Sequence, residues 1–308
     1  GALPIDESRI EVKDRLHPGK MLLVDTVKGE LIDDDKLKEK FATKQPYGEW
    51  LDNNLIKLED LKIPNKKVPT HTKEERARLQ KAFGYTYEDF RTSILPMALN
   101  GSESIGAMGI DTPLAVLSNR HQPLFNYFKQ LFAQVTNPPI DSIREKIVTA
   151  TTVYLGKDGN ILEEQPENCK NLKINNPILT NTDLLKIKNM KVEGFKVETI
   201  PITYYKNTSI EKAIDHLFVE VDRAHREGAN IIILSDRGVD ENHVAIPSLL
   251  AVGAVQHYLV QTKKRTSMAV ILESGEPRDV HHFATLLGYG ASAINPYLAQ
   301  ESIQELID

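Results

Sequence analysis

The carboxyl-terminal half of the chain consists of short apolar runs separated by amphipathic segments. Residues 195–204 alternate in polarity, as a strand does, whereas 230–235 and 268–273 are continuous apolar runs. Continuous runs of this length indicate strands that are covered on both faces of a sheet. Between them, apolar residues recur at helical spacings of three and four, at Ile210, Ala213, Ile214, Leu217, Val221 and Ala224.

Further helices follow the same alternation. Thr208 and Glu211 have the spacing of a capping box at the start of the first helix. Residues 246–260 and 280–287 predict two more helices, and 293–295 a further strand. The order β-α-β-α-β-α-β predicts a parallel sheet with right-handed crossovers. This α/β pattern fits either part of a (β/α) barrel or an open doubly wound sheet.

The amino-terminal region has a different, mixed pattern. Residues 21–32 predict two short strands around a turn, and the charged residues 33–40 a solvated helix. Residues 58–75 are polar and contain Pro64 and Pro69, so they are the best candidate for a linker.

The middle of the chain predicts short helices around a loop. Capping residues predict helices over 72–83 and 86–96, apolar spacing predicts one over 124–135, and a Leu-rich segment predicts one near 183–188. Residues 100–123 are rich in Gly, Ser and Pro but contain an apolar run, which favours a structured loop over a flexible linker.

Composition excludes several classes of protein. The chain has 308 residues, a net charge of −5 and a pI near 6.0, so it lacks the basic surplus of a nucleic-acid binder. We expect no membrane span, because no apolar stretch approaches about 20 residues. Cys169 is the single cysteine, which excludes an internal disulfide, a four-cysteine zinc site and a complete cysteine-ligated iron–sulfur cluster within the chain. It also favours a reducing cytoplasm.

Polar residues follow three successive predicted strands. Ser235, Asp236 and Arg237 follow the first, Glu273 ends the second and Asn295 ends the third. Functional groups in parallel α/β folds lie at these carboxyl ends. The pattern therefore suggests a carboxylate-lined site with a cation beside it, or else an ion pair that closes a loop.

Metal and cofactor motifs are weak. His281 and His282 are adjacent and would point about 100° apart on a helix, so we expect packing or a backbone hydrogen bond instead of a shared metal. Residues 288–291 follow a helix instead of a strand, which is the wrong order for a dinucleotide fingerprint. Cys169 lies in a polar context without an identifiable His partner, so a nucleophilic role is not expected.

The segment 100–139 is the least ordinary part of the chain. Met108 is a soft, adaptable side chain, and Thr136 and Asn137 precede two prolines that stiffen the backbone. Such a segment suits the wall of a narrow passage or a domain contact, or it is a simple interdomain loop.

Several long motifs resemble the central domain of glutamate synthase large chains. They are PMALNGSESIGAMGIDTPLAVLS (96–118), QLFAQVTNPPIDSIRE (130–145), NCKNLKINNPILT (168–180), SDRG (235–238) and ESGEPRDVHHFATLLGYGASAINPYL (273–298). The resemblance spans nearly the whole chain, with 35–70 the least informative stretch.

The resemblance implies a fold and a domain division. Residues 1–65 would be the tail of a glutamine amidotransferase region with a linker, a small mixed α+β segment. Residues 66–308 would be the central domain, an incomplete TIM-barrel-like (β/α) domain related to FMN-linked barrels but without flavin. The chain begins at Gly1 without an initiator Met, which we interpret as a section of a longer or processed chain.

The resemblance also implies a role. The parent enzyme converts glutamine, 2-oxoglutarate and reductant into two glutamates, using FMN and an iron–sulfur cluster. The family's glutaminase nucleophile is an amino-terminal Cys, but this chain begins with Gly1 and has only Cys169. The fragment alone should therefore be inactive and bind no cofactor. It would join the two catalytic domains and line the ammonia tunnel, with Met108, Thr136 and Asn137 at tunnel-facing positions.

The implied partners are the amidotransferase and FMN-binding domains of the same chain and a small reductase subunit, with no nucleic acid and no membrane. Two alternatives from the residues stay open. One is an independent barrel enzyme that uses Asp236, Arg237 and Glu273. The other is a non-catalytic binding module that uses the 100–139 loop.

Overall fold

The structure is a computed structural model that describes residues 4–107, 109–134 and 139–307. Its backbone divides into two compact units. One comprises Gly1–Asn53 with Pro139–Thr149, and the other comprises Asn54–Pro138 with Ala150–Asp308. The chain therefore passes from one unit to the other more than once.

The first unit is small and contains the predicted hairpin. β1 (Leu23–Asp25) pairs with β2 (Glu30–Ile32) in antiparallel register, which confirms the two strands around a turn. The charged segment after them is helical, as predicted. The helices of this part of the chain are η1 (Glu7–Arg9), α1 (Asp34–Ala42), α2 (Tyr47–Asn54) and α6 (Glu145–Val148).

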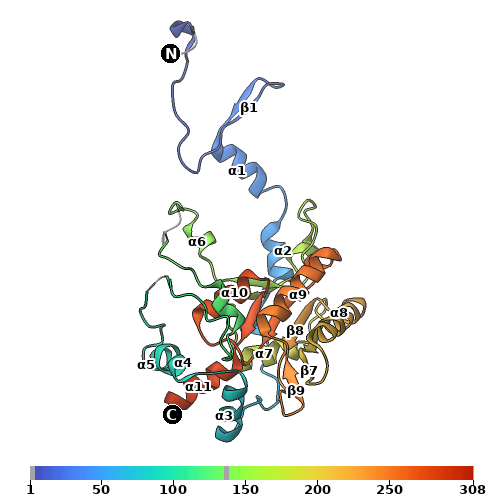
Figure 1. Cartoon of the computed structure of the whole chain (residues 1–308). Helices are drawn as coiled ribbons and strands as arrows, with labels where there is room; N and C mark the ends of the chain where they lie inside the picture. The colour runs from blue at the N-terminus through green and yellow to red at the C-terminus, as the bar shows by residue number, and fades with distance from the viewer. Residues whose placement is uncertain (1–3, 108, 135–138, 308) are drawn as a thin grey trace. The chain divides into compact units, whose positions relative to one another are not determined.

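The second unit is built on a four-stranded parallel sheet (Figure 1). In spatial order its strands are β11 (Ala293–Asn295), β10 (Ala269–Glu273), β8 (Ile231–Ser235) and β6 (Val197–Pro201). Beyond β11, Ile178 makes a parallel bridge to Ile294. The α/β class and the parallel sheet are confirmed.

Successive side chains of a strand point to opposite sides of the sheet. The side chains on both sides of this sheet are buried. Ile232 and Leu234 of β8 pack in a core with helix residues such as Leu217. Ile231 and Ile233 pack in a second core on the other face. This explains why the strands are apolar throughout.

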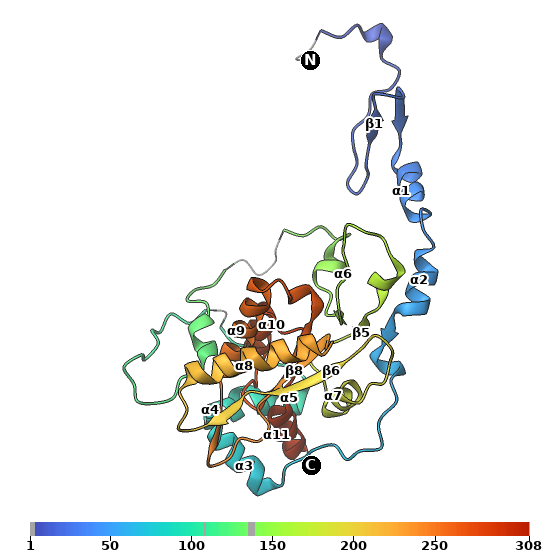
Figure 2. The same cartoon turned by 90° about the vertical axis from the view of Figure 1, so that its right-hand side faces the viewer.

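Helices connect the parallel strands, and all of those predicted between them are present. They are α7 (Asn181–Lys188), α8 (Ile210–Arg226), α9 (Ser248–Gln261) and α10 (Val280–Gly288), with α11 (Tyr297–Ile307) after the last strand. In Figure 2, α8 lies along β6, with which it is in contact. The predicted cap of α8 is one residue early: Ser209, not Thr208, accepts the hydrogen bond from the Lys212 amide.

A second, smaller sheet belongs to the other core. β3 (Ile56–Lys57) is parallel and β4 (Val153–Leu155) antiparallel to β5 (Leu172–Ile174), which lies between them. Leu155, Leu172 and Ile174 are buried there against the parallel sheet. Two short helical turns flank these strands, η2 (Leu58–Asp60) and η5 (Pro166–Cys169). β7 (Thr203–Tyr205) and β9 (His243–Ala245) form a separate antiparallel pair.

The helices before residue 101 differ from the prediction at one end. α3 (Lys73–Ala82) has the predicted Thr72–Glu75 capping box. The next helical segment does not stop at Pro96, and comprises α4 (Tyr87–Asp89), the π-helical turn η3 (Phe90–Ile94) and α5 (Leu95–Asn100). Pro96 directly follows the π-helical turn η3, at the start of α5, and the helical segment continues through it to Asn100.

The helix predicted over 124–135 is wrong. Only the short turn η4 (Leu124–Phe128) forms, and the backbone is extended at Lys129. Phe125 is anchored in the core of the parallel sheet, while Leu131 and Phe132 are exposed. The apolar residues of this segment therefore do not form one buried helical face, because Phe125 is buried and the later ones are exposed. A last turn, η6 (Arg265–Ser267), precedes β10.

Candidate functional site

The carboxyl end of the parallel sheet brings the predicted polar residues together. Strand register places Ser235, Glu273 and Asn295 side by side on β8, β10 and β11. Asp236 and Arg237 follow directly after β8. The sequence therefore identified a true cluster, and its contacts decide what it can do.

Glu273 is a buried acceptor with three donors. Its carboxylate accepts from Lys188 Nζ at 2.6 Å, from Arg237 Nε at 2.6 Å and from Ser235 Oγ at 2.8 Å. Burial alone would raise the pKa of Glu273, but the two cations outweigh it and the pKa is lowered. Glu273 is thus held as a carboxylate inside a double ion pair.

Asp236 is also buried but has no such compensation. Burial raises its pKa to about 7, although three groups donate hydrogen bonds to it. The Tyr297 hydroxyl donates at 2.8 Å, the Gly275 amide at 3.1 Å, and the Ser274 hydroxyl donates as well. Asp236 therefore ties the β8 and β10 loops to the start of α11.

Arg237 connects this cluster to a cavity. Its guanidinium lies 4.0 Å from the centroid of the Tyr297 ring, and both residues line a cavity of about 710 Å³. Asp236 and Glu273 do not line that cavity. An independent enzyme would need both carboxylates in one pocket, so the structure removes the support for that alternative.

Arg278, next to the cluster, fastens the α3–α4 segment to the sheet. It is buried and donates to the carbonyls of Phe83 and Gly84, each at 3.1 Å. Its guanidinium also lies 3.2 Å from Asp89 Oδ2 and 4.4 Å from the centroid of the Tyr85 ring. This buried cation joins segments about 190 residues apart.

The two adjacent histidines are structural, as predicted. His281 Nε2 lies 2.8 Å from the carbonyl oxygen of Phe125, and the His282 ring stacks on the Phe125 ring at 4.2 Å. Burial lowers the pKa of His282 to about 4. Among the residues that the structure describes, no three His, Cys, Asp or Glu side chains are grouped to hold a metal ion.

One histidine–carboxylate pair beside the cavity is not predicted by any motif in the sequence. His71 Nδ1 lies 3.0 Å from Glu301 Oε2, and the buried Glu301 comes from α11. The two residues are 230 positions apart and neither belongs to a local motif, so no sequence signal could have joined them.

The three residues predicted to face a tunnel, Met108, Thr136 and Asn137, lie outside the described residues. The loop around them is described in part. It carries exposed apolar side chains, with Leu117 96% exposed and Ile105 fully so.

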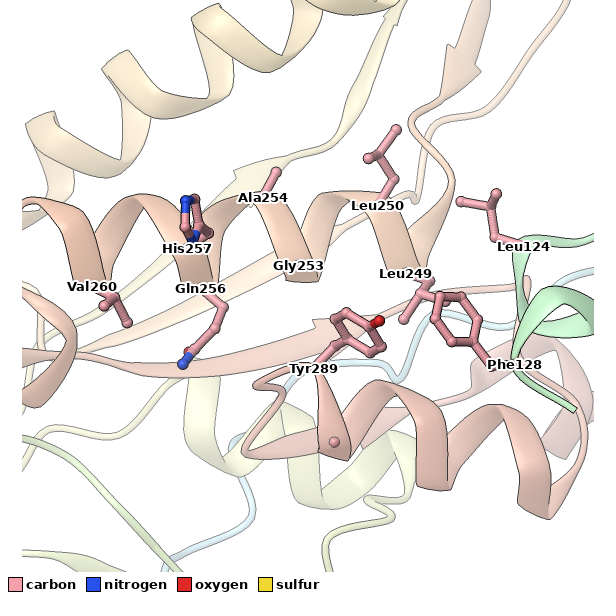
Figure 3. A pocket seen from close by; sticks show the side chains of 11 residues that line it. Leu124, Phe128, Leu249, Leu250, Gly253, Ala254, Gln256, His257, Val260 and Tyr289 are labelled. Atoms are coloured by element: carbon pink, nitrogen blue, oxygen red, sulfur yellow. The ribbon is translucent and has the colours of Figure 1, made fainter. Parts of the chain in front are cut away.

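A second cavity of about 610 Å³ lies along α9 (Figure 3). Phe128 and Tyr289 meet edge to face at its wall, with ring centroids 5.1 Å apart, and both lie next to Leu249. Gly253 leaves the helix surface bare there. The lining is mainly apolar, and Gln256, His257 and Tyr289 are its polar side chains.

Comparison with protein families matches residues 78–308 to the glutamate synthase central domain. The chain belongs to this family. Residues 1–50 match the class-II glutamine amidotransferases, so the glutamate synthase central domain is preceded on the same chain by an amidotransferase segment.

Several glutamate synthases are similar to this chain over nearly its full length. The NADPH glutamate synthase large chain of Bacillus subtilis is 42% identical, covering 100% of this chain and 20% of the relative. The NADH glutamate synthase of Schizosaccharomyces pombe is 42% identical, covering 100% and 15%. Ferredoxin-dependent glutamate synthase 2 of Synechocystis is 40% identical, covering 99% and 20%. The chain thus spans about a fifth or less of these relatives.

Proposed function

We propose that this chain is the central scaffold section of a glutamate synthase large chain. It joins the glutaminase domain to the FMN-binding synthase domain and lines the ammonia tunnel between them. The parent reaction is the conversion of glutamine, 2-oxoglutarate and reductant into two glutamates. The observation that carries the scaffold role is the carboxyl end of the sheet, where Asp236 and Glu273 are occupied by internal partners.

The finer fold proposal is an incomplete (β/α) barrel. The parallel elements follow one another along the chain as Ile178, β6, β8, β10 and β11, and each neighbouring pair from β6 onward is hydrogen-bonded. Ile178 bridges to β11, the last of them. A barrel joins its first strand to its last in this way. The ring then stays open between Ile178 and β6.

The proposed domain boundary stays at residue 65, with the amidotransferase tail before it. The family matches leave residues 51–77 to neither family, and residues 61–72 within that stretch form no helix or strand, which supports a linker there.

Neither cofactor of the parent enzyme belongs to this chain in our proposal. The cavity at the sheet end has three carboxylates in its lining (Glu75, Asp240 and Glu241) against two arginines (Arg78 and Arg237), so its lining is not the positive one that the phosphate of FMN would favour. The purified chain should be colourless and hydrolyse no glutamine, and bound FMN in it would count against the scaffold role.

The tunnel proposal rests on Met108, Thr136 and Asn137 and is tested in the full-length enzyme. Thr136→Trp or Met108→Trp should obstruct ammonia transfer, so glutamine hydrolysis should exceed glutamate formation. Lys212→Trp, at an exposed position of α8, is the matched control and should leave the two rates equal. Coupling that is unchanged in both tunnel variants would remove these residues from the tunnel.

We also propose an electron donor and a cellular location for the parent enzyme. The relatives' names include NADPH-, NADH- and ferredoxin-dependent enzymes, so a small reductase subunit is one candidate electron donor. Co-purification of the full-length protein separates these donors. No described helix combines the length and the apolar character needed to cross a membrane. We propose a cytoplasmic location, which fractionation of the source cells would test.

A further inference from the structure

The cavity of about 710 Å³ at the carboxyl end of β8 is lined by charged side chains of both signs, with Arg78 among the exposed ones. Arg237 and Tyr297 line its inner part, and Tyr297 is almost fully buried. Asp240, Glu241 and Glu75 line it at exposed positions. The volume is in the range of small-molecule sites.

Arg237 is held in place but has unused donors. Its Nε donates to Glu273 and its guanidinium carbon lies over the Tyr297 ring, 4.0 Å from the ring centroid. Its two terminal NH₂ groups donate to no acceptor within the described parts of the chain, although the side chain is only 19% exposed. A planar guanidinium with a free edge matches a carboxylate in two-point contact.

His71 adds a second polar group beside Arg237. Its Nδ1 contacts the Glu301 carboxylate, which leaves Nε2 to donate to another anion when the imidazole is protonated. The His71 ring centroid is 5.8 Å from that of Tyr297, and both residues line the cavity together with Arg237.

The acidic side of the cavity has the opposite preference. Asp240 Oδ1 accepts from the backbone amides of Asn242 and His243 and lies 3.0 Å from His243 Nδ1, which fixes the carboxylate in its turn, and the side chain remains 57% exposed. Glu241 is the next residue and is also exposed. Two neighbouring carboxylates favour a cation such as an ammonium group.

Apolar side chains complete the lining. Leu79 and Ala82 of α3 and Val239 of the β8–β9 loop belong to it. Leu79 and Val239 pack against the small core around Phe83 and Tyr297. They offer a surface for an aliphatic group.

We propose that this cavity binds a free α-amino acid with an aliphatic side chain. The carboxylate is held by Arg237 with His71, the ammonium group lies toward Asp240 and Glu241, and the side chain packs on Leu79, Ala82 and Val239. This site is separate from the proposed scaffold and tunnel roles and does not depend on them.

The test is calorimetric titration of the purified protein that contains these 308 residues with three probes. L-Leucine carries both charges, 4-methylpentanoate lacks the ammonium group, and L-leucinamide lacks the carboxylate. We expect L-leucine to bind with a Kd on the order of 1 mM or tighter. The other two should each bind at least about fivefold more weakly.

Variants assign the binding to this cavity. Arg237→Lys keeps a cation for Glu273 but loses the planar fork, and should weaken L-leucine about tenfold. Asp240→Asn with Glu241→Gln should weaken L-leucine about two- to fivefold and leave 4-methylpentanoate unchanged. Asp215→Asn, at an exposed position of α8, should change nothing.

Equal affinity for L-leucine and 4-methylpentanoate would overturn the proposal, as would the absence of saturable binding up to about 20 mM. Because Arg237→Lys alters a buried ion pair, its circular dichroism spectrum is compared with that of the wild type. If this variant does not fold, the analogues and the Asp240→Asn/Glu241→Gln protein decide the outcome alone.

Discussion

The carboxyl end of the parallel sheet and the 101–134 loop belong to the same unit but differ in the environment of their side chains. At the sheet end, Glu273 and Asp236 are buried and have partners supplied by the chain itself. In the described part of the loop, Leu117 and Phe132 are exposed although they are apolar.

Burial and the presence of internal partners distinguish structural residues from interacting residues better than the residue type does. The strand-end carboxylates Asp236 and Glu273 look functional in the sequence, yet here their partners are internal and they hold loops together. Apolar residues in a Gly-rich loop look like hidden core, yet here most of them face outward. Exposed apolar groups of this kind mark surfaces that contact something else, which agrees with the proposed domain-joining role of the loop.

The largest effect should come from Arg278. Arg278→Met removes a buried cation, leaves the carbonyls of Phe83 and Gly84 without their donor, and deprives the Asp89 carboxylate of its ion-pair partner. We expect the free energy of unfolding to fall by about 3–5 kcal/mol, measured by urea denaturation. Arg226→Met, at an exposed position of α8, should cost less than about 0.5 kcal/mol. Equal losses in both variants would show that Arg278 does not fasten the segment.

Gly275 tests how tightly the sheet end is packed. A methyl group there would lie 2.6 Å from the Phe83 ring and 3.0 Å from the Tyr297 hydroxyl. Gly275→Ala should therefore destabilise the protein by about 1–3 kcal/mol. Gly288→Ala is the control, because no atom lies within 4 Å of its added methyl group. It should be neutral or stabilising in the same thermal or urea measurement.

The two buried carboxylates should respond oppositely to pH. The folded-state pKa of Asp236 is raised from 3.8 to about 7, so its contribution to stability is greatest at low pH and is lost as pH rises from about 4 to 7. The pKa of Glu273 is lowered from 4.5, so its contribution is present above that value and lost as pH falls below it.

Urea denaturation of Asp236→Asn across pH 4 to 8 isolates the first effect. The stability difference between the wild type and the variant should shift in favour of the variant as pH rises through this range. The comparison with the variant is needed because His282 also makes stability depend on pH. Its pKa is lowered from 6.5 to about 4, so the free energy of unfolding decreases as pH falls through that range, which overlaps the range of Asp236. A difference that does not vary with pH would mean that Asp236 is charged in the folded protein throughout.

The smallest effect on stability should come from the loop. Leu117→Ser should change the free energy of unfolding by less than about 0.5 kcal/mol, since the side chain is already exposed. Phe125→Ala, from the fully buried end of the same region, should cost about 3–5 kcal/mol by urea denaturation. In the full-length enzyme, Leu117→Ser should instead lower the coupling of glutamine hydrolysis to glutamate formation. A loss of stability as large as that of Phe125→Ala would place Leu117 in the core.

The regular part of this fold follows from local patterns. Continuous apolar runs gave β8 and β10, and the 3.6-residue period gave α8, because both faces of the sheet and one face of the helix are buried. The Thr72–Glu75 box gave the start of α3 for the same local reason. The 124–135 helix failed because burial of Phe125 alone, not a continuous helical face, fixes that segment.

The candidate site was predictable only in part. Register brings Ser235, Glu273 and Asn295 together wherever strands are parallel, so their proximity could be read from the sequence. The Lys188 and His71 contacts could not, because they join segments 85 and 230 residues apart through tertiary packing. Whether a carboxylate is free or paired depends on such distant partners.

The division of the chain into units has a practical consequence for truncation. The backbone crosses between the units after residue 53, after 138 and after 149. A single protease cut at any of these crossings leaves at least one fragment that carries residues of both units. Removing the first 53 residues would in turn deprive Pro139–Thr149 of the segment with which it shares a unit. Trimming at the family boundary is therefore expected to expose this internal stretch to degradation.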